Sequence, residues 1–236
     1  MPTRTETVTV DDGGFALHVR TPASGTGPGL LLIQEIFGVG EYLREVAADL
    51  AALGYVVAAP DMFWRIRPGW AVEATEETVR QSMRISSRFD EAKGVDDLVA
   101  SLARLRDLPE VSGGTGALGF CFGGTLAYLL AARTRLDATV SFYGSGVPGR
   151  LDLLDRIRGP VQFHFGGSDP FIERGQVAEV ERAVDGRPGF EIHVQEDGGH
   201  AFHNRTAPMF YQPGPAERAW ALTETYLAEK LPTSGR

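Results

Sequence analysis

A single cysteine lies in the middle of a glycine-rich segment, Gly119-Phe120-Cys121-Phe122-Gly123-Gly124. Residues 115–119 before it suit a buried strand, and the apolar residues 126–132 after it suit a helix. A strand and a helix joined this closely need a very sharp turn, and small residues two positions before and after its centre let the central side chain project clear of the backbone. The segment therefore predicts a nucleophilic cysteine, since a thiol ionises far more readily than a serine hydroxyl.

Three further side chains that could take part in acyl transfer also follow predicted strands. Asp169 comes after residues 161–165, His200 after residues 190–194, and Glu35 directly after residues 31–34. In an open parallel sheet, functional residues gather at the carboxyl ends of the strands. We therefore expect all three side chains near Cys121.

The chain order of these residues, nucleophile then acid then histidine, is that of the α/β-hydrolases. His200 would act as general base and later protonate the leaving group, while Asp169 would hold the imidazole tautomer. The backbone amides of Phe122 and Ile36 are the expected oxyanion donors. Taken singly, these residues could instead be an inert core cysteine, an aspartate that caps a turn and a loop histidine.

Glu35 is the unusual member of the set, because an acid at the end of an apolar strand is costly unless it is paired or protonated. It could simply accept hydrogen bonds from loop amides. Alternatively, it is a second acid that acts on the thiol itself.

The elements that must position these residues alternate between strand and helix along the chain, which predicts parallel βαβ units. Residues 5–10 and 15–19 read as an antiparallel hairpin. We expect a single α/β domain over residues 1–236 with a doubly wound, mainly parallel sheet. Its further strands are predicted at 29–33, 55–59, 115–119, 138–143, 161–165 and 190–194, and its helices at 41–53, 75–89, 95–105, 172–184 and 216–230, with residues 109–114 outside any element.

The composition is that of an ordinary globular protein, with 43% hydrophobic and 23% charged residues. The net charge of −8 argues against nucleic-acid binding. We expect no membrane span and no signal peptide, and a lone cysteine excludes an intramolecular disulfide, which together favour the cytoplasm. Because the 5 histidines show no ligand spacing, we expect no metal and no cofactor.

Several short motifs occur in a fixed order over nearly the whole chain. They are Gln34-Glu35-Ile36-Phe37-Gly38, Pro60-Asp61, Gly119-Phe120-Cys121-Phe122-Gly123-Gly124, Phe142-Tyr143-Gly144, Gly166-Gly167-Ser168-Asp169 and Gly199-His200-Ala201-Phe202. Together these motifs resemble the dienelactone hydrolase family. That resemblance implies hydrolysis of cyclic or activated esters, typically carboxymethylenebutenolides formed in aromatic degradation. It also implies Cys121 as nucleophile, His200 and Asp169 as its partners, and Glu35 as a switch.

In the scheme that the family implies, the resting thiol is neutral and turned away from His200. Substrate binding moves Glu35, which accepts the thiol proton, and the thiolate then swings toward His200. A thiolate that forms only with substrate bound is protected from oxidation.

The chain departs from the family where a substrate carboxylate should be held. Val79 and Met83 occupy the positions of an expected Arg and Tyr on the helix at 75–89, and Asn204 occupies that of an Arg after the catalytic histidine. Either a short gap restores the match, or the pocket differs. Arginines do lie close by: Arg80, Arg84 and Arg88 on one helical face, which could equally be a solvated face, and Arg205.

The predicted substrate is a small lactone or ester, with or without a carboxylate, cleaved through a thioester acyl-enzyme by a monomer or small homo-oligomer. Two alternatives stay open: a general carboxylesterase or arylesterase, and a non-catalytic small-ligand binding protein. The expected substrate contacts, several of which could instead be core aromatics, are Phe37, Trp64, Arg80, Arg84, Tyr143, Phe202 and Arg205.

Overall fold

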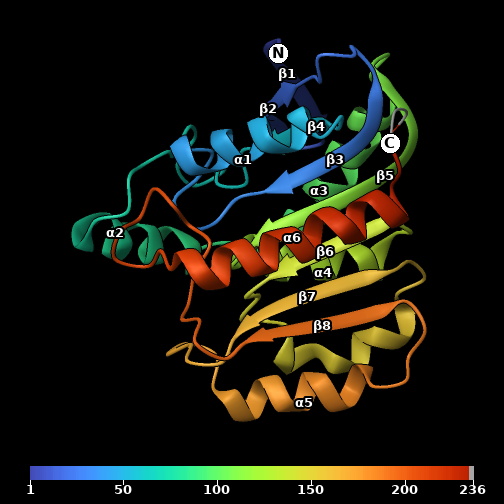
Figure 1. The fold of residues 1–236 in the computed structure, drawn as a ribbon. Helices are drawn as coiled ribbons and strands as arrows, with labels where there is room; N and C mark the ends of the chain where they lie inside the picture. The colour runs from blue at the N-terminus through green and yellow to red at the C-terminus, as the bar shows by residue number, and fades with distance from the viewer. Residues whose placement is uncertain (234–236) are drawn as a thin grey trace.

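The computed structural model describes residues 1–233, which form one eight-stranded sheet in the order β1-β2-β4-β3-β5-β6-β7-β8 (Figure 1). Strands β1 and β2 form an antiparallel hairpin, β2 also pairs antiparallel with β4, and the remaining neighbours are parallel. The predicted α/β fold with an N-terminal hairpin is thus confirmed. The strands are β1 Thr3–Val10, β2 Gly13–Arg20, β3 Gly27–Ile33, β4 Val56–Pro60, β5 Val111–Phe120, β6 Ala138–Phe142, β7 Val161–Gly166 and β8 Phe190–Gln195.

Helices cover both faces of the sheet, with α1 and α6 on one side and α3 and α4 on the other (Figure 1). The central parallel strands are therefore buried on both faces: every residue of β3, β4, β6 and β7 is buried. This explains why β3 and β4 are continuous apolar runs rather than alternating patterns. The helices are α1 Glu41–Ala52, α2 Glu76–Ser86, α3 Glu91–Arg106, α4 Phe122–Arg133, α5 Arg174–Val184 and α6 Pro213–Lys230.

The structure moves several predicted boundaries by a few residues and adds one element. Helix α3, for example, begins at Glu91 rather than at residue 95, and α6 begins at Pro213 rather than at residue 216. Strand β5 begins at Val111, so the glycine-rich stretch before residue 115 is strand rather than a break. Gly114 fits there because a Cβ would press on Asp137 and Leu231, so this glycine serves packing and not a turn. A 3₁₀ helix, η1 Pro148–Arg156, lies in a segment for which no element was predicted. It is short and kinked at Arg150, which hides the helical period.

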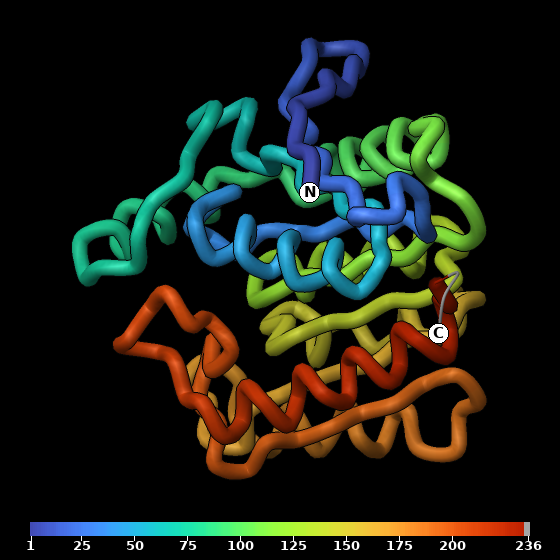
Figure 2. The backbone as a smooth tube through the Cα atoms, turned by 45° about the horizontal axis from the view of Figure 1, so that its top comes forward, coloured from blue at the N-terminus to red at the C-terminus, as the bar shows by residue number. Residues whose placement is uncertain are grey.

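The carboxyl ends of the parallel strands all meet at one edge of the sheet. Helix α2 and the chain segment before α6 both project on that side in Figures 1 and 2. Within residues 1–233, no helix is long and apolar enough to cross a membrane.

Candidate active site

Cys121 occupies the sharp turn between β5 and α4, with φ 53° and ψ −114°. A non-glycine residue in this region is strained by about 1–3 kcal/mol, and such strain persists where the surrounding structure enforces it. Two glycines enforce it here: a Cβ at Gly119 would collide with the Gly123 carbonyl, and one at Gly123 would collide with the Ile33 carbonyl. The Cys121 backbone N–H is held by the Phe142 carbonyl at 2.9 Å.

Three residues predicted to act together do meet at this turn. The His200 Nε2 lies 3.1 Å from the Cys121 Sγ, and its Nδ1 lies 2.7 Å from the Asp169 Oδ2. The imidazole is therefore hydrogen-bonded on both ring nitrogens. This geometry lets one group take the thiol proton while another steadies the charge that results.

The contacts of Asp169 are compatible with both roles between which the sequence left a choice. Its Oδ1 accepts hydrogen bonds from the backbone amides of Phe171 (2.7 Å) and Ile172 (3.2 Å), which closes a turn after β7. Its Oδ2 remains for His200. The turn thus fixes the carboxylate that orients the imidazole.

The protonation of His200 follows from the groups around it. Burial disfavours the imidazolium, but the negative charge of a Cys121 thiolate and the hydrogen bond to Asp169 outweigh burial and raise the pKa of His200 to about 10. The sulfur lies toward the imidazole. This differs from the resting arrangement that the family resemblance implies, in which the thiol is turned away, because the Cys121 side chain already makes its hydrogen bond to His200.

Glu35 follows β3 and is 3% exposed. Its Oε2 accepts a hydrogen bond from the Asn204 Nδ2 at 2.7 Å, and its Oε1 accepts a longer one from the Tyr143 hydroxyl at 3.4 Å. The Asn204 amide is oriented in turn, because its Oδ1 accepts from both the backbone N–H and the hydroxyl of Thr206. Burial raises the pKa of Glu35 to about 7, although the Asn204 hydrogen bond and the charge of His200 oppose this rise.

A cavity of about 300 Å³ opens beside the sulfur. Ile36 and Phe122, whose backbone amides are the expected oxyanion donors, both line it, as does the predicted Phe37. Phe122 is the first residue of α4, and the first N–H groups of a helix have no partner within the helix. The full lining is Glu35, Ile36, Phe37, Val79, Met83, Ser86, Glu91, Cys121, Phe122, Thr125, Leu126, Ser145, Gly146, Arg150, Phe171, His200, Ala201 and Phe210.

The arginines expected to hold a substrate carboxylate lie elsewhere, which corrects that part of the prediction. Arg205 points to α1, where it forms ion pairs with Glu45 and Asp49 at 2.6 and 2.7 Å. Arg80 is exposed and pairs with its helical neighbour at position 77 at 2.8 Å. Arg84 is exposed and does not line the cavity. The face of α2 that turns to the cavity carries Val79 and Met83 instead.

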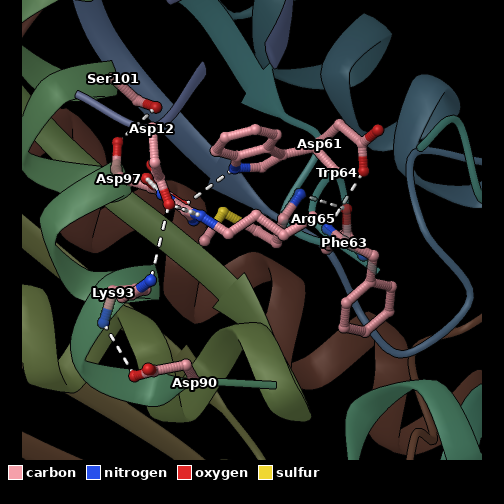
Figure 3. Close-up of polar contacts among 11 residues, drawn as sticks. Asp12, Asp61, Phe63, Trp64, Arg65, Asp90, Lys93, Asp97 and Ser101 are labelled. Carbon is pink, nitrogen blue, oxygen red and sulfur yellow. Dashed lines mark hydrogen bonds and ion pairs between the residues drawn. The ribbon is translucent and has the colours of Figure 1, made fainter. Parts of the chain in front are cut away.

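Trp64 is also misplaced by the prediction. Its ring stacks on Phe15 at 5.5 Å, and its Nε1 donates to Asp97 at 3.0 Å. The Arg65 guanidinium lies over the indole and pairs with the same aspartate (Figure 3). These contacts anchor the loop after β4 to α3, so the tryptophan has a structural role away from the cavity.

Tyr143 and Phe202 lie behind the cavity rather than in its wall. Both are fully buried, and their rings pack edge to face at 5.2 Å. Tyr143 touches the site indirectly, through its hydrogen bond to Glu35 and a ring contact with His200 at 5.3 Å. They support the residues around the nucleophile but do not form the cavity surface.

Several cavity residues were not predicted from the sequence, among them Glu91, Arg150, Phe171 and Phe210. Phe171 lies two residues after Asp169 in a turn that must display it, so the Asp-Pro-Phe order was an available signal. Arg150 and Phe210 come from η1 and from the loop before α6, and nothing in their local sequence marks them. Among residues 1–233, no three His, Cys, Asp or Glu side chains are grouped so as to hold a metal ion.

Known proteins similar to this chain include carboxymethylenebutenolidases and dienelactone hydrolases. A carboxymethylenebutenolidase of Pseudomonas sp. strain P51 is 35% identical over 234 residues, 97% of either chain. One from Pseudomonas putida is 33% identical over 210 residues, 89% of either chain. A crystal structure described as a dienelactone hydrolase from Klebsiella pneumoniae subsp. pneumoniae superposes with a TM-score of 0.83 at 22% identity, covering 97% of this chain and 98% of that one. The family model for the dienelactone hydrolase family matches residues 15–231. The chain belongs to this family and is a carboxylic ester hydrolase.

Proposed function

We propose that the protein hydrolyses a lactone or activated ester through Cys121, with His200 and Asp169 as its catalytic partners. The observation that carries the proposal is the hydrogen-bonded chain from the Cys121 sulfur through both ring nitrogens of His200 to Asp169. The strained turn that presents the sulfur to an open cavity supports the same assignment. A non-catalytic ligand-binding protein would have no need of this chain of contacts.

The reaction follows from the geometry. His200 takes the thiol proton, and the Cys121 sulfur attacks the carbonyl carbon of the ester. The carbonyl oxygen becomes an oxyanion, which the amides of Phe122 and Ile36 stabilise. Collapse of the tetrahedral intermediate breaks the ester C–O bond, and His200 gives its proton to the leaving alkoxide. A thioester remains; water, deprotonated by His200, attacks it and releases the acid and the thiol.

Glu35 controls the thiol through charge in this proposal. The negative form of Glu35 would favour the imidazolium form of His200, since the two groups interact electrostatically. A favoured imidazolium means a favoured thiolate at Cys121. Because its pKa lies near 7, Glu35 changes charge around neutral pH, and it would make the nucleophile sensitive to pH and to bound substrate.

The experiment is to trap the acyl-enzyme from a 4-nitrophenyl ester by rapid acid quench and mass spectrometry. Wild type is expected to gain the mass of the acyl group on the tryptic peptide that contains Cys121, and Cys121→Ala is expected to lose hydrolysis. Cys121→Ser is the matched variant, because it keeps the turn and exchanges sulfur for the poorer oxygen nucleophile. Full activity in Cys121→Ala would refute the nucleophile assignment.

A further inference from the structure

Four apolar side chains line the cavity around the reacting groups. Val79 and Met83 come from α2, Phe171 from the turn after β7, and Phe210 from the loop before α6. Three segments far apart in the sequence thus bring apolar side chains to one opening. Convergence of this kind is typical of a site that binds an apolar group.

Two of these four side chains, together with a neighbour of a third, are exposed to solvent. Met83 is 53% exposed and Phe171 is 63% exposed, and Met209, next to the lining residue Phe210, is 51% exposed. Apart from Met1, these are the exposed large apolar residues among those that the structure describes. Exposed apolar side chains that gather at one cavity indicate a binding surface.

The guanidinium in the cavity wall is already paired with a carboxylate of the same wall. Arg150 is the one Lys or Arg among the described lining residues, and its Nη2 lies 2.9 Å from both carboxylate oxygens of Glu91. Its Nη1 donates to the Gly146 carbonyl at 3.0 Å. A substrate carboxylate would therefore meet a cation that is already neutralised, in a cavity that also contains Glu35.

We propose that the substrate carries an uncharged, apolar acyl group, and that Glu91 determines this preference by occupying Arg150. The inference rests on the proposed function, because it concerns the same cavity and the same acyl transfer. An anionic acyl group would lose water and find no free cation, which costs free energy. Glu91 is thus a specificity-determining residue rather than a member of the catalytic set.

The test compares two esters with one leaving group. The probes are 4-nitrophenyl hexanoate and the mono-4-nitrophenyl ester of hexanedioic acid, which differ by a terminal carboxylate. For wild type, kcat/KM is expected to favour the neutral ester by roughly 10-fold or more, because the carboxylate of the anionic ester would leave water without gaining a cationic partner. Equal values, or a preference for the anionic ester, would overturn the proposal.

Charge variants sharpen the test because they act in opposite directions. Glu91→Gln frees the Arg150 charge and should raise the ratio of anionic to neutral kcat/KM by about 3–10-fold, within the range for one hydrogen bond to a charged group in a partly exposed site. Arg150→Gln leaves Glu91 unpaired and should lower that ratio. The double variant should return close to the wild-type ratio. Because each value is a ratio within one protein, partial loss of folded enzyme does not alter it.

The outcomes separate this inference from the proposed function. If Cys121→Ala keeps hydrolysing both esters, the nucleophile assignment fails whatever the ratio. If hydrolysis depends on Cys121 but the ratio is unchanged in Glu91→Gln and in Arg150→Gln, the catalytic assignment stands and the role of Glu91 is refuted.

Discussion

Glu35→Gln should change how the stability of the protein depends on pH. Glu35 is buried, and its pKa is raised from 4.5 to about 7, chiefly by burial. The folded state therefore binds this proton more tightly than the unfolded chain does. The associated stability is fully present below pH 4.5, is lost as the pH rises toward about 7, and does not change further above that. Glutamine is close in shape, stays neutral, and can still accept the Asn204 hydrogen bond.

The size of this stability change follows from the pKa values of Glu35 in the unfolded and folded states. Raising the pKa of Glu35 from 4.5 to about 7 corresponds to about 3 kcal/mol over the whole titration. Most of that loss falls between about pH 5 and about pH 8. His200, whose pKa is also raised, loses stability in the same direction over a higher range, but it is present in both proteins and largely cancels from their difference.

The assay is urea unfolding of wild type and Glu35→Gln at about pH 5 and about pH 8. We expect the wild type to lose about 2–3 kcal/mol more than the variant between the two conditions. Glu179→Gln, at an exposed glutamate of α5, measures the effect of removing one surface charge. Equal pH dependence in wild type and Glu35→Gln would show that Glu35 is not buried as an acid of raised pKa, and the charge-control role would lose its basis.

Three other perturbations test the parts around the nucleophile. Asn204→Leu removes the short hydrogen bond to the Glu35 carboxylate, so the pKa of Glu35 should rise further, by an amount equivalent to about 1–2 kcal/mol. NMR titration of a labelled Glu35 carboxyl group measures this shift, and an unchanged pKa would show that the contact is unimportant. Gly123→Ala places a Cβ against backbone carbonyls and should lower the free energy of unfolding by about 1–3 kcal/mol or more, whereas an unchanged melting temperature would contradict the tight-turn argument. Asp169→Asn should lower kcat by at least about 100-fold with little change in far-UV circular dichroism, because His200 loses the carboxylate that orients it; a kcat within a few-fold of wild type would count against this role.

Much of the site could be predicted because its chemistry depends on local sequence. The glycines around Cys121 are required because backbone carbonyls lie too close for a Cβ, at Gly119 within the turn and at Gly123 from the end of β3, so a short motif reports them. Asp169 and His200 follow parallel strands, and parallel strands bring their carboxyl ends to the same edge. The order of chain elements therefore sufficed to place three distant side chains together.

The residues of the cavity wall could not be predicted in the same way. They depend on the direction in which each side chain points, and some belong to segments whose sequence has no clear helical or strand periodicity. Asn204 and Arg205 are adjacent, yet one reaches Glu35 while the other pairs with α1. Arg150 belongs to η1, and the kink in this helix gives its sequence the pattern of a loop.

The sequence by itself determined the fold and the meeting of Cys121, His200 and Asp169 at one edge of the sheet, since each follows from turn glycines or from the alternation of strand and helix. Tertiary structure alone decided the direction of the thiol, the raised pKa of Glu35 and the pairing of Arg150 with Glu91. The physical reason is that burial and charge pairing arise from contacts between residues far apart in the chain, and no local pattern encodes them.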